Sequence, residues 1–259
     1  MYRPAAIVLV LVFAAGLACG QDLNHFRTVL ESDNTEAKRN VLLQIRELKN
    51  EDASRIATKA LSDRNEMIRA TGASSLLGLP SAEAVTVLKP LLKDRSPFVR
   101  TEAAFALGRV GDVTAVQPLV GMLQKDGAKE ARAAAAISLG KIGDISALGP
   151  LTDVFRKSPV EDNEFIRRSA ARSIGEIGER VRANGGKGDL TSFQAAVQAM
   201  IKALNNSKET DDTRREAAFA LGAIGDRDAI PTLTSHLNSP DYYLAEICKK
   251  AIAAIESGQ

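Results

Sequence analysis

One phrase recurs along most of the chain and constrains the fold more than any other feature of the sequence. A clear copy, RTEAAFALGRVGD, spans Arg100–Asp112, and near-copies span Arg132–Asp144 and Arg214–Asp226. Looser copies begin at residues 38, 69, 167 and 248, so most copies lie about 31–35 residues apart. A fixed period in this range is typical of a solenoid, in which each unit packs on its neighbours. The repeated positions therefore serve stacking, and function must come from positions that vary.

Each unit is predicted to be a helical hairpin. Ala103 and Leu107 belong to an apolar stripe with helical spacing. Gly111 and Asp112 end this helix, because glycine tolerates positive φ and aspartate can cap the next helix. A second apolar stripe follows in residues 115–123. Hydrophobic residues make up 45% of the chain and aromatic residues only 4%, which favours a thin, two-layer, all-α stack.

The repeated small and charged residues have structural explanations. Paired alanines, such as Ala103 and Ala104, let neighbouring helices approach closely. Arginine and aspartate recur at fixed places in the repeat, and a residue needed in every unit is most simply a cap or a partner in an ion pair between units. We therefore expect structural roles for Arg100, Arg132, Arg167, Arg214, Asp112, Asp144 and Asp226.

The phrase resembles the short HEAT repeats of the bilin-lyase type, in which V-R-x-x-A-A-x-A-L-G-x-I-G-D joins two antiparallel helices. The resemblance covers roughly residues 33–259. It implies a right-handed α-solenoid of about six to seven hairpins. The solenoid is expected to span residues 21–259, with a glycine-rich insertion at 179–192. The repeat does not define an activity, because it serves scaffolds, lyases and nucleic-acid enzymes alike.

The N-terminus has the order of an export signal. Arg3 precedes an apolar stretch, and small residues close it at 16–20. Residues 1–20 are therefore predicted to be a signal peptide of a bacterial protein, which would be periplasmic or lipid-anchored to the cell envelope. The sequence leaves two alternatives for how the signal is processed: lipidation at Cys19, or cleavage after Gly20.

The sequence predicts neither catalysis nor a metal or cofactor site. His25 and His236 are the two histidines, and they lie far apart, whereas a catalytic zinc normally takes three protein ligands. The iron-dependent hydroxylases that use HEAT repeats carry paired His-Glu motifs, and this chain has none. No serine stands in a G-x-S-x-G elbow.

The expected function is a non-enzymatic interaction scaffold that binds another protein along its concave face. In HEAT solenoids the second helices are expected to line that face. The candidate partner-binding residues are Arg55, Lys59, Lys89, Gln117, Gln124, Arg156, Gln198 and Lys202. A lyase or chaperone-like factor resembling the bilin lyases is the alternative, and a nucleic-acid-binding HEAT protein is a less favoured third. Nucleic acid is not an expected partner, because 34 basic and 32 acidic residues nearly balance, and no obligate oligomer is implied.

Overall fold

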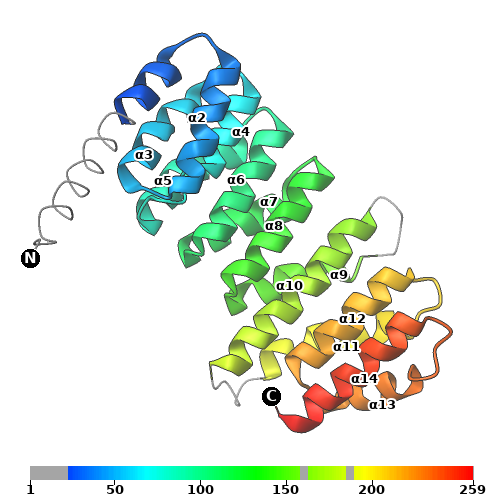
Figure 1. Cartoon of the computed structure of the whole chain (residues 1–259). Coiled ribbons are helices and arrows are strands. Elements are labelled where there is room, and N and C mark those ends of the chain that lie inside the picture. Colours follow the sequence, from blue (N-terminus) through cyan, green and yellow to red (C-terminus); the bar gives the residue numbers. More distant parts are fainter. Residues whose placement is uncertain (1–22, 158–162, 185–189, 259) are drawn as a thin grey trace, which may run out of the picture.

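The computed structural model describes residues 23–157, 163–184 and 190–258, and every regular element in these ranges is a helix. A helix at residues 23–31 comes first, and helical hairpins then follow one another from α2 at one end to α14 at the other (Figure 1). The first helices of the hairpins, here called the motif helices, are α2 (Thr35–Leu48), α4 (Glu66–Ser74), α6 (Pro97–Val110), α8 (Lys129–Ile142), α10 (Glu164–Ala183), α12 (Asp211–Ile224) and α14 (Tyr242–Ser257). The second helices are α3 (Glu51–Ala57), α5 (Ser81–Leu88), α7 (Val116–Lys125), α9 (Leu148–Phe155), α11 (Gln194–Leu204) and α13 (Ile230–Ser235). The predicted all-α solenoid is confirmed.

The Gly-Asp pair ends α6, α8 and α12 as the sequence predicts, whereas α10 continues past Gly178 and Glu179 to Ala183. Gly111 closes α6 at φ 76°, and the carboxylate of Asp112 accepts the backbone N–H of Thr114 to start a short 3-10 helix, η3 (Val113–Ala115). The same arrangement recurs at Gly143-Asp144 and Gly225-Asp226.

The first unit lacks this glycine, and Lys49 takes the left-handed conformation at φ 49° in its place. Its second helix is capped by the side chain of Asn50, which accepts the N–H of Ala53. The departure from the repeat therefore changes the turn and preserves the hairpin.

Small residues bring neighbouring motif helices into close contact. Gly108 of α6 lies so near α8 that a Cβ atom placed on it would come within 2.8 Å of the Cα atom of Ser138. The hydroxyl of Ser138 donates a buried hydrogen bond of 2.8 Å to the carbonyl oxygen of Ala104. Gly222 of α12 meets Ala251 of α14 in the same way. Neighbouring units are thus joined at backbone distance.

Ion pairs join neighbouring units at five junctions among the described residues. The basic residue of one motif helix reaches the acidic residue that lies just before the following motif helix, and that carboxylate commonly also accepts a backbone N–H of its own turn. The predicted structural roles of Arg100 and Arg167 are confirmed in this form. Arg215 takes the place of the expected Arg214. The series comprises Lys38–Asp63, Arg69–Asp94, Arg100–Asp126, Arg167–Glu209 and Arg215–Asp241.

The spacing of the helices sets the direction of the curve. Successive motif helices touch extensively, whereas successive second helices touch one another much less. In a two-layer stack the layer with the closer spacing lies on the inner side. The motif helices therefore form the inner face and the second helices the outer face. This reverses the expectation that second helices line the concave face, and the reason is the run of alanine and glycine on the motif helices.

Two predicted segments fall partly or wholly outside the described residues. Residues 1–20, with Cys19, are outside them, so the signal peptide stays a prediction. Of the predicted insertion at 179–192, residues 179–183 belong to α10, and η6 (Leu190–Phe193) begins the next element. Lys187 lies outside the described residues. Within the described ranges, no helix is both long and apolar enough to cross a membrane.

Candidate functional site

A hollow of about 780 Å³ lies on the inner face, across α10, α12 and α14. We call it the inner hollow. Its floor is apolar, and its rim carries four basic and two acidic side chains. The floor includes Phe219, Ala223, Ile247, Ala251 and Ala254, and the rim consists of Arg172, Arg182, Arg215, Lys250, Glu179 and Glu216. The charged rim therefore carries an excess of positive charge.

Arg172 and Phe219 form one side of the inner hollow. The guanidinium carbon of Arg172 lies 4.2 Å from the centre of the Phe219 ring. Its Nη1 atom lies 3.4 Å from a carboxylate oxygen of Glu216. A cation over an aromatic face is held by the ring quadrupole, so Arg172 is fixed in place while it stays at the surface.

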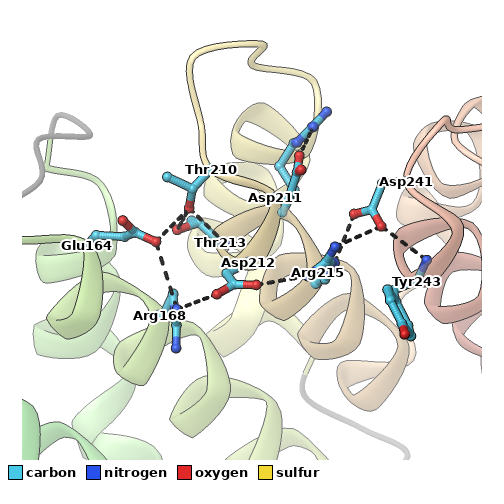
Figure 2. A network of polar contacts seen from close by, with 10 residues as sticks. Glu164, Arg168, Thr210, Asp211, Asp212, Thr213, Arg215, Asp241 and Tyr243 are labelled. Atoms are coloured by element: carbon cyan, nitrogen blue, oxygen red, sulfur yellow. Dashed lines mark hydrogen bonds and ion pairs between the residues drawn. The ribbon is translucent and has the colours of Figure 1, made fainter.

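Arg215 is held on the rim by a network that joins three motif helices (Figure 2). Arg215 contacts both oxygens of Asp241 at 2.9 Å, and its Nη1 donates to Asp212 at 2.9 Å. Asp212 in turn accepts from Arg168 of α10 at 2.6 Å. The ring of Tyr243 lies against Arg215, 5.2 Å from its guanidinium carbon. The network fixes the distances between α10, α12 and α14 at their N-terminal ends.

Arg182 fixes the opposite, C-terminal ends of the same helices. Its guanidinium donates to the carbonyl oxygens of Gly222 and Ala223 in α12, and to that of Ala254 in α14. These bonds satisfy carbonyl groups that a helix end leaves free. Within the described ranges neither Arg182 nor Lys250 forms an ion pair, but Arg182 is held by these carbonyl groups. Lys250 has no such bond and is therefore available to a ligand.

Two carboxyl groups on this face are half-buried and have raised pKa values. Glu216 lines the inner hollow and also a smaller hollow of about 140 Å³ beside it, together with Glu176. Burial raises the pKa of Glu216 and of Glu176, against the opposing effect of Arg172 on both. Half-buried carboxyl groups with raised pKa values can act as proton donors or acceptors.

The described residues do not fit the metal site of an iron-dependent hydroxylase. They contain no group of three or more His, Cys, Asp or Glu side chains placed to hold a metal ion. His25 lies in the first described helix, and His236 follows α13, where its Nδ1 lies 3.0 Å from the carbonyl oxygen of Thr232. The two imidazoles are thus at opposite ends of the solenoid.

The structure places all eight sequence-predicted partner-binding residues on the second helices or the segments that follow them, and therefore on the outer face. Arg55 is paired with Glu51 and Glu83, and Lys59 with Glu31. Lys89, Gln117 and Gln124 lie on η2 (Lys89–Lys93) and α7, apart from the others. The structure does bring together Arg156, Gln198 and Lys202, at a hollow of about 470 Å³ between α9 and α11.

Sequence reasoning missed the inner-face residues, although the repeat contains a signal for them. One position lies between constant small residues of the phrase and changes from copy to copy. It is occupied by Phe105, Ile137, Arg172 and Phe219 in α6, α8, α10 and α12. These side chains are at least partly exposed, while the alanines and serines on either side of them are buried. A position that varies among constant stacking residues marks the exposed face of a repeat.

Comparison with known proteins defines the class. A model of HEAT repeats matches residues 23–104, 87–162 and 161–256. The chain therefore belongs to the HEAT-repeat family, as the phrase predicted. Deoxyhypusine hydroxylase-B of rice (Oryza sativa) is 25% identical over 83% of this chain and 85% of its own length.

Two similarities lead to bilin lyases. Phycocyanobilin lyase subunit alpha of Nostoc is 36% identical, over 24% of each chain. In structure, the complex of CpcE and CpcF of phycocyanin lyase from Nostoc matches with a TM-score of 0.52 at 19% identity, covering 92% of this chain and 94% of that one. At this identity the structural match shows the fold alone.

These relatives overturn two predictions. The prediction of a non-enzymatic scaffold is wrong, because the relative aligned over most of the chain is an enzyme and shorter matches are also to deoxyhypusine hydroxylases. The predicted location in a bacterial envelope is also contradicted, because those hydroxylases come from eukaryotes such as rice and Gallus gallus. The expected protein partner stays a prediction.

Proposed function

We propose that the protein is a lyase-type enzyme, or a subunit of one, that holds an open-chain tetrapyrrole in the inner hollow and acts on a protein partner. The observation that carries this proposal is the combination of an apolar floor with a rim of fixed cations. An open-chain tetrapyrrole has the matching chemistry, since it is a conjugated apolar body that bears carboxylates.

The size and lining of the inner hollow support a ligand of this class. Its volume of about 780 Å³ falls within the usual range of small-molecule sites, roughly 300–1,000 Å³. Phe219 offers an aromatic surface on which a conjugated system can stack. Lys250 and Arg172 stand at the edge, where carboxylates of the ligand would reach them. Glu216 supplies a carboxyl group that can exchange a proton with the bound molecule.

A titration with phycocyanobilin tests the binding step. The purified protein is mixed with the pigment, and its visible absorption and fluorescence are followed to saturation. We expect saturable binding that Phe219→Ala weakens by about three- to tenfold, through loss of an aromatic contact. Lys250→Glu is expected to weaken it further, because a cation at the rim becomes an anion.

Matched controls lie at neighbouring or equivalent positions. Phe105 occupies the place of Phe219 in α6, and Lys249 precedes Lys250 on α14 without lining the inner hollow. Phe105→Ala and Lys249→Glu should bind the pigment as the unaltered protein does. Absence of saturable binding, or equal losses in controls and test variants, would contradict the proposal. Pigment that stays on an apo-phycocyanin subunit after denaturing electrophoresis would report the transfer step.

A further inference from the structure

The outer face carries a second hollow, distinct from the inner hollow and lined by a different set of side chains. It has a volume of about 470 Å³ and lies between α9 and α11. We call it the outer hollow. Ala199 and Ala203 contribute small apolar side chains, the almost fully buried Phe155 lies beneath, and Gln198 and Asn206 contribute amides. Arg156, Lys157 and Lys202 also line it.

The floor of the outer hollow is already neutral. Arg167 and Glu209 form an ion pair through two hydrogen bonds, and their side chains are only 3% and 4% exposed. Nε of Arg167 also donates to the carbonyl oxygen of Phe155 at 3.0 Å. The single carboxylate that lines this hollow is therefore fully committed to its buried partner.

The three outer cations have no such compensation. Arg156 donates to the carbonyl oxygen of Ala195 at 3.1 Å, a bond that leaves its charge in place. Within the described ranges neither Lys157 nor Lys202 forms an ion pair, and Asp153, nearby on α9, pairs with none of the three. Elsewhere on this face Arg55 is neutralised by carboxylates. Among the residues that the structure describes, the outer hollow is thus a concave surface where uncompensated positive charge gathers.

The small size of the outer hollow makes these charges act together. A volume of 470 Å³ corresponds to a width of roughly 8 Å, which is about the Debye length in physiological salt. The fields of the three cations therefore reinforce one another across it. A ligand that complements them needs several negative charges at close spacing, together with small apolar contacts to Ala199 and Ala203.

We propose that the outer hollow is a docking site for an acidic segment of a partner protein, held by Arg156, Lys157 and Lys202 with Gln198 bonding its backbone. An extended acidic peptide presents a carboxylate on every residue or every second residue, and its backbone amides match the glutamine side chain. The site is independent of the inner hollow, so the enzyme could bind its small ligand on one face and its protein partner on the other.

The experiment uses a labelled decapeptide of alternating glutamate and glycine, with the full chain titrated in by fluorescence anisotropy. We expect saturable binding that weakens several-fold when salt is raised from about 0.05 to 0.3 M. The same peptide with glutamine in place of glutamate should not bind. The triple variant Arg156→Glu, Lys157→Glu and Lys202→Glu should bind the acidic peptide at least about tenfold less tightly.

A second triple variant, Lys89→Glu, Lys93→Glu and Lys125→Glu, changes the net charge equally on the same face and should retain the affinity. Lys157→Gln with Lys202→Gln removes two charges without adding any, and should still weaken binding about threefold or more while leaving the melting temperature unchanged. Equal loss in both triple variants, or no saturable binding of the acidic peptide, would overturn the proposal.

Two further measurements separate this site from its alternatives. A single-stranded oligonucleotide of the same charge that binds more tightly than the peptide would overturn the assignment to an acidic protein segment. Phycocyanobilin binding should be unchanged in the Arg156, Lys157 and Lys202 variant. Loss of pigment binding in that variant alone would overturn the independence of the two hollows. If no form of the protein binds the pigment, the proposal for the inner hollow fails, and the peptide titration still decides the proposal for the outer hollow.

Discussion

Replacing glycine by alanine is expected to have opposite effects on stability at two positions within helices. Gly121 lies within α7, and a Cβ atom added there would meet nothing within 4 Å. Gly121→Ala should therefore show only the higher helix propensity of alanine and raise the free energy of unfolding by about 0.5–1 kcal/mol. Gly108 lies within α6, where the added atom would meet Ser138 at 2.6 Å from Oγ, 2.7 Å from Cβ and 2.8 Å from Cα.

Three terms give the size of the effect at Gly108. The methyl group forces α8 away from α6, which costs roughly 1–3 kcal/mol as overpacking. The separation also strains or breaks the hydrogen bond from Ser138 to Ala104, worth about 0.5–1.5 kcal/mol. The higher helix propensity of alanine offsets up to about 1 kcal/mol of this loss. The net expectation for Gly108→Ala is a loss of about 1–3 kcal/mol.

Urea unfolding followed by circular dichroism measures both variants under identical conditions, after a second probe has shown that the solenoid unfolds in one transition. A double variant sharpens the result: Ser138→Gly removes the Cβ and Oγ atoms that Gly108→Ala would strike, so the two substitutions together should cost less than the sum of their separate effects. If Gly108→Ala is as stable as the unaltered protein, or if its free energy of unfolding rises as that of Gly121→Ala does, close backbone approach does not govern the stacking.

Three shorter predictions follow from individual side chains. The Arg69 guanidinium lowers the pKa of Asp94, so the pair stabilises the fold above the unfolded pKa of aspartate and loses its effect as pH falls through the lower folded value. Asp94→Asn should therefore destabilise the protein by roughly 3 kcal/mol at pH 7, and the difference should vanish near pH 2 in pH-dependent melts. Burial, with a smaller contribution from a nearby carboxylate, raises the pKa of the Cys248 thiol to about 11, so a disulfide reagent at pH 8 should react only after denaturant is added. Gly143→Ala should lower the melting temperature, because Gly143 has φ 79° and a Cβ atom would collide with Arg180, which donates to a carbonyl at the end of α8.

The period and composition of the chain predicted the stack itself, because stacking depends on residues that every unit shares. The phrase located the helix ends at Gly111 and Asp112, and both have the predicted roles. The sequence predicted that repeated arginines form ion pairs between units, but it did not predict which acidic residues they meet. The acid that meets Arg100 is Asp126, which lies outside the repeated phrase, and only the fold brings it within 2.7 Å.

The site could not be located in the same way, because it depends on which helix layer faces inward. Spacing of apolar residues predicts two helices per unit and says nothing about which layer is more compact. The compact layer is set by the small residues at the helix contacts, such as Gly108 opposite Ser138. Those contacts place Phe219 and Arg172 on the inner face, and leave Lys202 on the outer one.

Arg180 and Arg182 show how far the local sequence can mislead about function. Next to a glycine-rich stretch they resemble mobile basic residues of a contact loop. The structure instead extends α10 to Ala183, six residues longer than α6, α8 and α12. Arg180 then reaches back to a carbonyl of α8, and Arg182 reaches forward to α12 and α14.

The inner hollow therefore depends on the extra length of α10. Arg182 closes the C-terminal ends of α12 and α14 round the apolar floor, and the network through Arg215 closes their N-terminal ends. With both ends of these helices fixed, the inner hollow between them keeps a constant width, and the residues that vary between repeats line it. A ligand bound there meets a floor and rim whose positions are already set, which reduces the ordering cost of binding. Function in this repeat protein would thus come from the longest of its motif helices, α10.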